Sequence, residues 1–188
     1  PLQISTFRGG PYSGRITDVG VAMDLCTHDI DITLSLFTSP YEVVFASVLR
    51  THGQHHESSL RATGKLANGV IFSHDVNWIS HRKERRVQVT LEKATLVADL
   101  LTGDVTSYES AATPMDWESV SAHRGLFDGR VTREGIYKKE PLLSELEAFL
   151  DAVSGRDSIL VSFEEGLEAV LVAEAFLESA RRSEAVWP

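Results

Sequence analysis

The sequence predicts an α+β domain built on an open, mainly antiparallel sheet with helices on one face. Three observations predict it: strand-like segments joined by short turns between residues 41 and 109, a helical pattern before them, and two helical patterns after them. Strands joined by short hairpins pair antiparallel, and alternation of apolar and polar residues leaves one face covered. A run of strands followed by helices is typical of α+β domains.

The N-terminal part is expected to hold one irregular segment and one helix. Glycine, proline and serine residues punctuate Pro1–Gly20, which indicates an irregular leader. Over Val21–Phe37 apolar residues recur near helical spacing, and Pro40 closes the segment. We therefore expect the first helix at Val21–Phe37, directly after the leader.

The sheet is expected to come from the middle of the chain. Ser59–Leu66 alternates apolar and polar residues, and the Asn68-Gly69 pair after it is the strongest two-residue hairpin signal in the sequence. A second turn is expected at Thr102-Gly103-Asp104. Further strands are favoured around these turns at Tyr41–Leu49, Val70–Ile79, Arg85–Leu91, Thr95–Leu101 and Val105–Tyr108.

Two helices are expected near the C-terminus, after a stretch of little periodicity at Ser110–Lys139. Pro141–Val153 places its apolar residues on one face, and proline suits a first helical turn. Ser162 and Glu165 match a capping box, which predicts the start of a helix that runs toward Arg181-Arg182. We expect all three helices to pack on the same face of the sheet.

The composition excludes several classes of protein. The 188 residues suffice for one compact domain, and 18 Lys and Arg against 27 Asp and Glu give a net charge of −9. We exclude nucleic-acid binding, which needs a basic face, and membrane insertion, which needs ~20 apolar residues in a run. The single cysteine, Cys26, and the lack of a signal peptide predict a cytoplasmic protein. Because the chain begins at Pro1, we expect it to be processed or cut from a longer protein.

The strongest candidate for chemistry lies in the first expected helix. On a helix, Asp24, His28 and Asp31 stand at positions i, i+4 and i+7, so they project from one face. A carboxylate one turn from an imidazole can hold its tautomer and stabilise the imidazolium, as a general base requires. The same spacing also fits a solvated polar stripe, and the residues alone leave both interpretations open.

A histidine cluster is the second candidate. His52, His55 and His56 with Glu57 have side chains that could bind zinc. The same run lies between two expected strands, where a solvated polar loop or polar contacts to a substrate are the alternatives. We expect no metal site there.

Basic residues form the third group. Arg8 and Arg15 in the glycine-rich leader could clamp a phosphorylated ligand, since arginine matches phosphate geometry bidentately, or could be ordinary surface residues. The basic run from His81 to Arg86 is expected to be a solvated end of a hairpin. No G-x-G-x-x-G, P-loop, G-x-S-x-G or H-E-x-x-H motif is present, so the sequence holds no usual binding element for a dinucleotide.

The first helix and three later stretches resemble one known family in order and spacing. The segment Gly20–Asp31 resembles the D-x-x-x-H-D-x-D helix of the Gfo/Idh/MocA oxidoreductases. The later stretches that agree consist of short pieces in the same order: Ala67–Val70 and Val76–Ser80, then Arg82-Lys83, Val87–Thr90 and Thr95–Asp99, and then Glu140–Leu142, Glu145–Leu150 and Val161–Leu167. The resemblance covers nearly the whole chain, and it is specific as a set.

The resemblance implies a fold, a reaction and a missing partner domain. Members are similar two-domain NAD(P)-dependent dehydrogenases, whose N-terminal Rossmann domain holds the dinucleotide and supplies a catalytic lysine from a Glu-Lys-Pro motif. Residues 1–188 resemble only the C-terminal substrate-binding and oligomerisation domain, of the glyceraldehyde-3-phosphate dehydrogenase-like C-terminal type. The isolated chain is therefore expected to be inactive and to hold no cofactor-binding residues, with NAD or NADP bound mainly by the absent domain.

The resemblance also implies roles for the candidate residues. His28 and Asp24 would be catalytic, with Asp24 orienting His28, and Arg8, Arg15 and Asp31 would bind a sugar or UDP-sugar. The leader looks like that of the UDP-N-acetylglucosamine 3-dehydrogenase subgroup, which would suit arginines beside a diphosphate. The implied function is hydride transfer between a sugar hydroxyl carbon and NAD(P), and the alternative is a non-enzymatic oligomerisation or binding module with the same fold.

The uncovered face of the sheet is expected to form a subunit interface. This face would carry either the His74/Trp78 set or the Asp75/Asn77/Ile79 set, because neighbouring residues of a strand point to opposite faces. A broad sheet face bearing apolar residues usually needs a partner, so we expect a homodimer or homotetramer.

Overall fold

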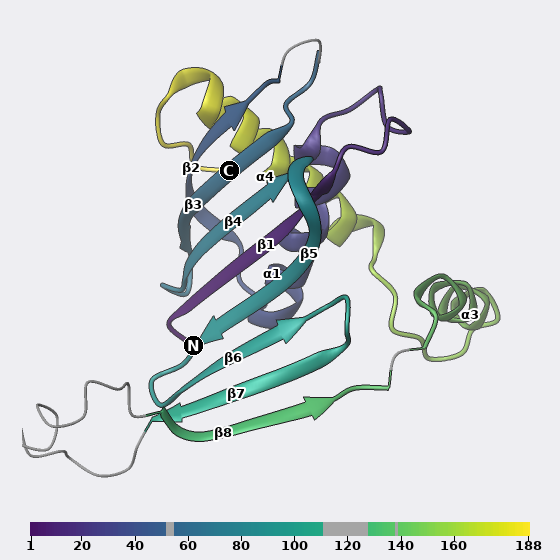
Figure 1. Cartoon of the computed structure of the whole chain (residues 1–188). Helices are drawn as coiled ribbons and strands as arrows, with labels where there is room; N and C mark the ends of the chain where they lie inside the picture. Colours follow the sequence, from purple (N-terminus) through teal and green to yellow (C-terminus); the bar gives the residue numbers. More distant parts are fainter. Residues whose placement is uncertain (52–54, 111–127, 138) are drawn as a thin grey trace, which may run out of the picture.

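The protein forms one mixed eight-stranded sheet with helices behind it, an α+β domain, in a computed structural model that describes residues 1–51, 55–110, 128–137 and 139–188 (Figure 1). The strand order is β2-β3-β4-β1-β5-β6-β7-β8. The strands are β1 (Gln3–Pro11), β2 (Tyr41–Leu49), β3 (Ser59–Leu66), β4 (Ile71–Asn77), β5 (Ile79–Thr90), β6 (Ala94–Asp99), β7 (Asp104–Ser110) and β8 (Asp128–Gly135). The α+β class and the mainly antiparallel pairing are confirmed.

The expectation of an irregular leader is wrong for its first half, because residues 3–11 form the central strand β1. This strand pairs parallel with β4 and antiparallel with β5, and β1–β4 is the parallel pair among the described strands. Ile4, Thr6 and Arg8 alternate toward the covered face, where all three are buried. The glycines and the proline that suggested a loop fall at its end, where a register shift between Gly9 and Pro11 breaks the ladder.

Two of the three main helices cover one face of the sheet over strands β1–β5 (Figure 1), and none of the described residues of β6–β8 is buried. The helix expected at Val21–Phe37 forms as a π-helical turn, η1 (Ala22–Cys26), followed by α1 (Thr27–Phe37), which ends at Thr38 with a left-handed backbone. The last helix, α4 (Phe163–Arg182), opens on the capping box between Ser162 and Glu165. Fully buried side chains from both helices and the sheet make the core, among them Ile30, Phe72 and Phe176.

The helix α3 (Pro141–Val153) has the expected bounds, but it does not pack on the sheet (Figure 1). Its large apolar side chains are all exposed, including Phe149 at 55% and Val153 at 71%. The prediction of three helices on one face is therefore wrong in this respect. An apolar stripe predicts that a helix buries one face, but it does not say against which part of the protein.

The strand β8 is a second element that the pattern did not indicate. It extends the sheet beyond β7 at residues 128–135, inside the stretch expected to be irregular, and Asp104 pairs with Arg133 across the two strands. Residues 111–127 of that stretch lie outside the described residues.

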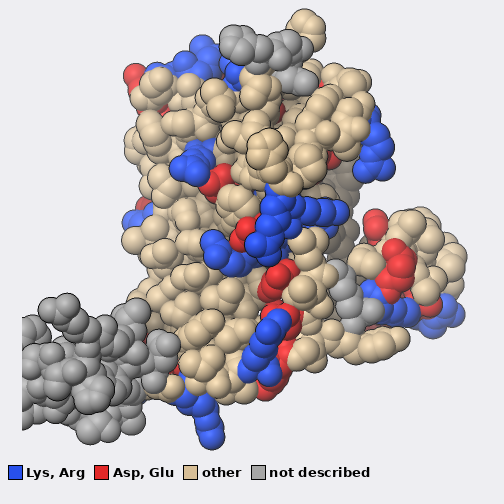
Figure 2. Space-filling view, viewed as in Figure 1, with Lys and Arg blue, Asp and Glu red and all other residues tan. Residues whose placement is uncertain are grey.

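Of the two sets, Asp75 lies on the open face and His74 in the core, whereas Asn77 is buried and lines a pocket. His74 points into the covered core and is 1% exposed, whereas Asp75 pairs with Arg61 on the open side. Figure 2 shows this face as mostly uncharged, with basic and acidic side chains close together across its middle. Of the described helices, none has the length and apolar content needed to cross a membrane.

Candidate functional site

The helix that carries the candidate residues begins on a buried carboxylate. The backbone amides of Val21 and Ala22 donate to the main-chain oxygen and to Oε1 of Glu57, at 3.1 and 2.9 Å. Gly20 makes this approach possible, because a Cβ there would lie 2.0 Å from the Glu57 carboxylate. Glu57 thus satisfies amides at the helix start and fixes where Asp24 and His28 stand.

A pocket of about 350 Å³ lies between this helix and the ends of the central strands. Its walls come from the end of β1 with the connection after it, from the helix, from the end of β4 and from β5. The charged and aromatic residues among them are Arg8, Arg15, Asp24, His28, Trp78, Lys83 and Arg85. Segments that lie far apart in the sequence therefore meet in one cavity.

The structure brings Asp24 and His28 together in this pocket. Asp24 accepts a hydrogen bond of 3.3 Å from Nε1 of Trp78, and the Trp78 ring packs against Tyr12 with ring centroids 5.2 Å apart. Burial and then the positive charge of Arg8 lower the pKa of His28, while the Asp29 and Asp24 carboxylates oppose this shift. The imidazole is consequently neutral at neutral pH, the state in which it can accept a proton.

Arg8 reaches the pocket but is already paired. Its Nε and Nη2 atoms both donate to Oδ1 of Asp29, at 3.0 and 2.7 Å, and both side chains are buried. Burial raises the pKa of Asp29, and the bonds from Arg8 lower it. The pair therefore holds a nearly neutral unit at the base of the pocket, next to His28.

Asp31 does not join the other candidates. It lines a separate hollow with Glu165 and Glu168, and burial and then the charge of Glu165 raise its pKa. Seven residues of helix advance by about 10 Å, so Asp31 is carried past the pocket although it shares a helical face with Asp24. Arg15, by contrast, does line the pocket, from the connection between β1 and η1.

Lys83, Arg85 and Trp78 also line the pocket. The expectation that the basic run from His81 to Arg86 is a solvated end of a hairpin is wrong, because the run lies inside β5 and two of its cations line the pocket. Lys83 and Arg85 lie on the face of β5 that also carries Val87, since Arg85 stands opposite Arg8 and Val87 opposite Thr6. The alternation that places Val87 and Val89 inward could have found them if it had been continued toward the N-terminus.

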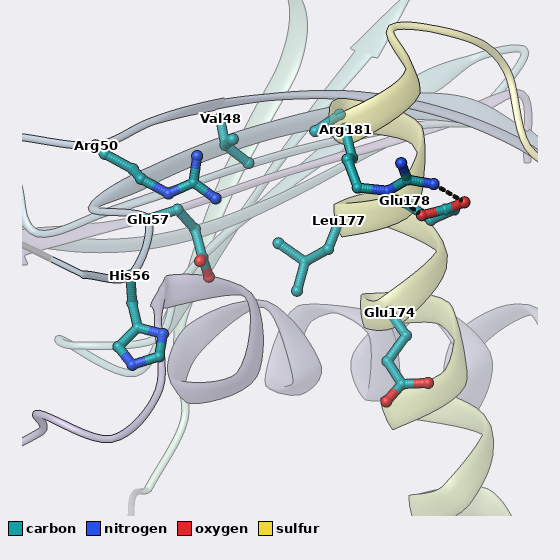
Figure 3. Close-up of a pocket in the computed structure, with 9 residues that line it drawn as sticks. Val48, Arg50, His56, Glu57, Glu174, Leu177, Glu178 and Arg181 are labelled. Atoms are coloured by element: carbon teal, nitrogen blue, oxygen red, sulfur yellow. Dashed lines mark hydrogen bonds and ion pairs between the residues drawn. The ribbon is translucent and has the colours of Figure 1, made fainter.

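A second cavity, of about 430 Å³, lies between α4 and the segment that precedes β3 (Figure 3). Arg50, His56 and Glu57 line one side, and on the other Arg181 is paired with Glu178. Neither Asp24 nor His28 lines this second cavity. The Glu57 carboxylate lines it but already accepts a hydrogen bond from the Ala22 amide.

The histidine cluster for which we expect no metal site lies in the segment that precedes β3. Part of the histidine cluster, including His52, lies outside the described residues, whereas His55 and His56 are described. Within the described ranges no group of three or more His, Cys, Asp or Glu side chains is arranged to hold a metal ion.

The described helix starts do not fit the pyrophosphate of a dinucleotide. A pyrophosphate binds where a glycine-rich turn leaves backbone amides free at a helix N-terminus. Here Glu57, Glu140 and Ser162 already accept hydrogen bonds from the first-turn amides of the described helical segments that begin near residues 22, 141 and 163. A carboxylate in two of these positions would also repel a phosphate.

Comparison with known proteins gives one matching family and several similar structures. Residues 14–187 match the family described as "Oxidoreductase family, C-terminal alpha/beta domain". The UDP-N-acetylglucosamine 3-dehydrogenase of Acidithiobacillus ferrooxidans is 24% identical over 186 residues, which cover 95% of this chain and 56% of that protein. Its solved structure matches with a TM-score of 0.83, at 21% identity, over 97% of this chain and 55% of that one.

Two further solved structures share the fold. An NAD-binding protein from Listeria innocua has a TM-score of 0.74 and 18% identity, over 99% of this chain and 55% of that one. Levoglucosan dehydrogenase, in complex with NADH and levoglucosan, has a TM-score of 0.76 and 15% identity, over 99% of this chain and 58% of that one. The chain thus spans a little over half the length of the proteins it matches.

Proposed function

Because the chain belongs to the oxidoreductase family whose C-terminal alpha/beta domain its residues 14–187 match, we propose that it is the substrate domain of a sugar or nucleotide-sugar dehydrogenase. The observation that carries this proposal is the position of the His28 imidazole in the pocket, one helical turn from Asp24, and the lowered pKa of His28 supports it. The names of the similar proteins, which include a UDP-sugar dehydrogenase and a levoglucosan dehydrogenase, support a sugar substrate.

The residues of this chain would handle the proton of the reaction. A sugar hydroxyl in the pocket would give its proton to His28 as its carbon is oxidised, and the Asp24 carboxylate would favour the imidazolium that forms. NAD or NADP, when bound, would supply the acceptor for the hydride. Trp78 holds Asp24 by its indole N–H, so it would keep the carboxylate turned toward the pocket.

The dinucleotide would be held by another domain of the full-length protein. Two observations support this: the described helix starts are occupied by side-chain oxygens, and the chain spans only 56% of the UDP-sugar dehydrogenase it resembles. The exposed apolar face of α3 would be covered in such an assembly, because large apolar patches seldom stay in water. We accordingly expect the isolated chain to lack dehydrogenase activity.

Replacement of His28 tests the proposal in the full-length enzyme. His28→Ala should lower kcat by about 10²–10⁴, the usual contribution of a general base, with little change in Tm because His28 faces the pocket and is only partly covered by other side chains. Asp24→Asn should lower kcat less, since His28 remains. His55→Ala, at an exposed histidine outside the pocket, is the matched control and should leave kcat unchanged. Wild-type turnover in His28→Ala would show that this helix is only structural.

A further inference from the structure

The pocket that holds His28 carries an excess of positive charge. Four cationic side chains line it, against the single carboxylate of Asp24. Arg8 is neutralised by Asp29, so the unbalanced charge comes from Arg15, Lys83 and Arg85. In the described part of the chain, none of these three forms an ion pair with a carboxylate. The chain as a whole has a net charge of −9, so a local cationic surface is not a consequence of composition.

The placement of Arg85 is unfavourable for folding alone. Arg85 stands directly opposite Arg8 in the β1–β5 ladder, and like charges in opposite positions destabilise a sheet. Burial and then the neighbouring charge of Arg8 lower the pKa of Arg85, while the Asp29 and Asp24 carboxylates oppose this shift. Arg85 and His28 line the same pocket, and the positive charge of Arg85 contributes to the lowered pKa of His28. A cation at such a position is typical of a binding site, because residues that serve function often lower the stability of the fold.

We propose that Lys83 and Arg85, with Arg15 facing them from the connection after β1, bind the diphosphate of a nucleotide-sugar substrate and select it over neutral sugars. This inference rests on the proposed function and deepens it. Residues two positions apart on one face of a strand are separated by about 7 Å, so two cations can each hold one phosphoryl group of an extended diphosphate. A ligand with a single carboxylate would need only one of these two cations.

Among the described side chains, the four cations of the pocket fall into one paired residue and three unpaired ones. Asp29 holds Arg8 in two hydrogen bonds, which leaves Arg8 as a fixed support beside His28 and the three unpaired cations as the surface toward solvent. Lys83 and Arg15 are exposed and Arg85 is half-buried, so the cationic surface runs from the rim of the pocket inward. The diphosphate would lie along this surface, with the sugar directed to His28.

Equilibrium binding by the 188-residue chain tests the proposal without any turnover. The probes are uridine diphosphate, inorganic pyrophosphate and N-acetylglucosamine, each followed by titration calorimetry at low and high salt. Uridine diphosphate should bind, pyrophosphate should compete with it, and N-acetylglucosamine should not. Binding should weaken as salt rises. Lys83→Gln and Arg85→Gln should each raise the Kd for uridine diphosphate about 10- to 100-fold, as expected for lost charge-assisted hydrogen bonds.

Two controls distinguish a phosphate site from a general charge effect and from a structural role of Arg85. Arg61→Gln removes a cation on the open face of the sheet and should leave the Kd unchanged. Arg85→Gln should keep or raise Tm, because Arg85 forms no ion pair with a described carboxylate and stands opposite another arginine, whereas a structural role would lower Tm. Wild-type affinity in both pocket variants, or no binding of uridine diphosphate by the parent chain, would overturn the inference.

The failure of the proposed function has a different signature. His28→Ala should bind uridine diphosphate as tightly as the parent chain, because it removes no cation at neutral pH. If the full-length His28→Ala enzyme kept its turnover while Arg85→Gln lost diphosphate binding, the catalytic assignment would fail and the diphosphate site would stand.

Discussion

At the scale of single residues, buried polar groups connect the pocket with the core. His74 is fully buried, and its two ring nitrogens lie 2.8 Å from the hydroxyls of Thr6 and Tyr41. Both hydroxyls can donate or accept, so the neutral ring is satisfied in either tautomer. Phe72 and Phe176 enclose it, with ring centroids 5.1 and 6.0 Å away. The residue is thus a structural histidine of the core, unlike His28.

The burial of His74 predicts how stability depends on pH. Desolvation lowers the pKa of His74 to about 3, from 6.5 in the unfolded chain. Between these two pH values the unfolded state binds one more proton at this site than the folded state. His74 therefore does not lower the free energy of unfolding above pH 6.5, and it lowers this free energy progressively as the pH falls toward 3. The slope from this group approaches about 1.4 kcal/mol per pH unit.

Denaturant unfolding of the chain between about pH 7 and pH 4 checks this prediction. His74→Gln should remove this part of the slope, while the parts due to carboxylates remain. A direct measurement is the NMR titration of the His74 ring in the intact chain, which should show no transition between about pH 5 and 8. A transition near pH 6.5, the ordinary value, would contradict the prediction.

At the scale of elements, the contact between Glu57 and the start of the first helix joins the site to the sheet. Glu57 precedes β3, and its carboxylate reaches across to the Ala22 amide from 35 residues away. The π-helical turn at Ala22–Cys26 follows directly, and it carries Asp24. Such turns occur often at functional sites, because an extra residue in the turn re-aims a side chain.

Substitution of Gly20 tests this contact. In Gly20→Ala the added Cβ would force the Glu57 carboxylate away, and the buried Ala22 amide would lose its partner. We expect the free energy of unfolding to fall by about 1–3 kcal/mol, the cost of an unpaired buried polar group. Gly166→Ala is the matched control, because it lies within α4 with open space around its Cβ.

The control should change stability in the opposite direction. Alanine is a better helix former than glycine, so Gly166→Ala should stabilise the protein by about 0.5–1 kcal/mol. Chemical denaturation of both variants measures the difference. Equal stability of Gly20→Ala and the parent chain would mean that Glu57 does not hold the helix start.

At the scale of the whole molecule, the two faces of the sheet differ in their cover. The helices α1 and α4 cover one face over strands β1–β5 only, whereas the opposite face turns outward in Figures 1 and 2. Exposed apolar side chains lie on this outward face, from β2 at one edge to β7 and β8 near the other, with ion pairs between them. They are Phe45, Ile71, Tyr108 and Val131.

This outward face is the predicted interface between subunits. We expect sedimentation of the parent chain to show a dimer or tetramer, because burying these apolar side chains favours association. The double variant Phe45→Glu/Tyr108→Glu should sediment as a monomer, since it places charges within the interface. Leu36→Glu adds one such charge at an exposed apolar residue of α1 and should leave the assembly unchanged. A monomeric parent chain at high concentration would contradict the prediction.

The local sequence determined the elements whose signals lie within a few residues. The Asn68-Gly69 turn forms between β3 and β4 with Gly69 at a φ of 89°, and the bounds of α3 follow from Pro141 and the apolar stripe. The capping box at Ser162 forms as predicted. Each of these depends on backbone dihedrals and hydrogen bonds between near neighbours, which a pattern in one segment encodes.

Only the tertiary structure decided which segments meet. Residues 3–11 form the central strand because they pair with β4 and β5, which lie far away in the sequence. The exposed apolar side of α3 shows that an apolar stripe does not determine which part of the protein a helix packs against. Asp24 and His28 were visible as a pair because one helical turn joins them. Lys83 and Arg85 entered the pocket because β5 pairs with β1, the strand that also brings Arg8 to Asp29. Non-local pairing depends on the summed packing of the whole core, and no single stretch of sequence contains it.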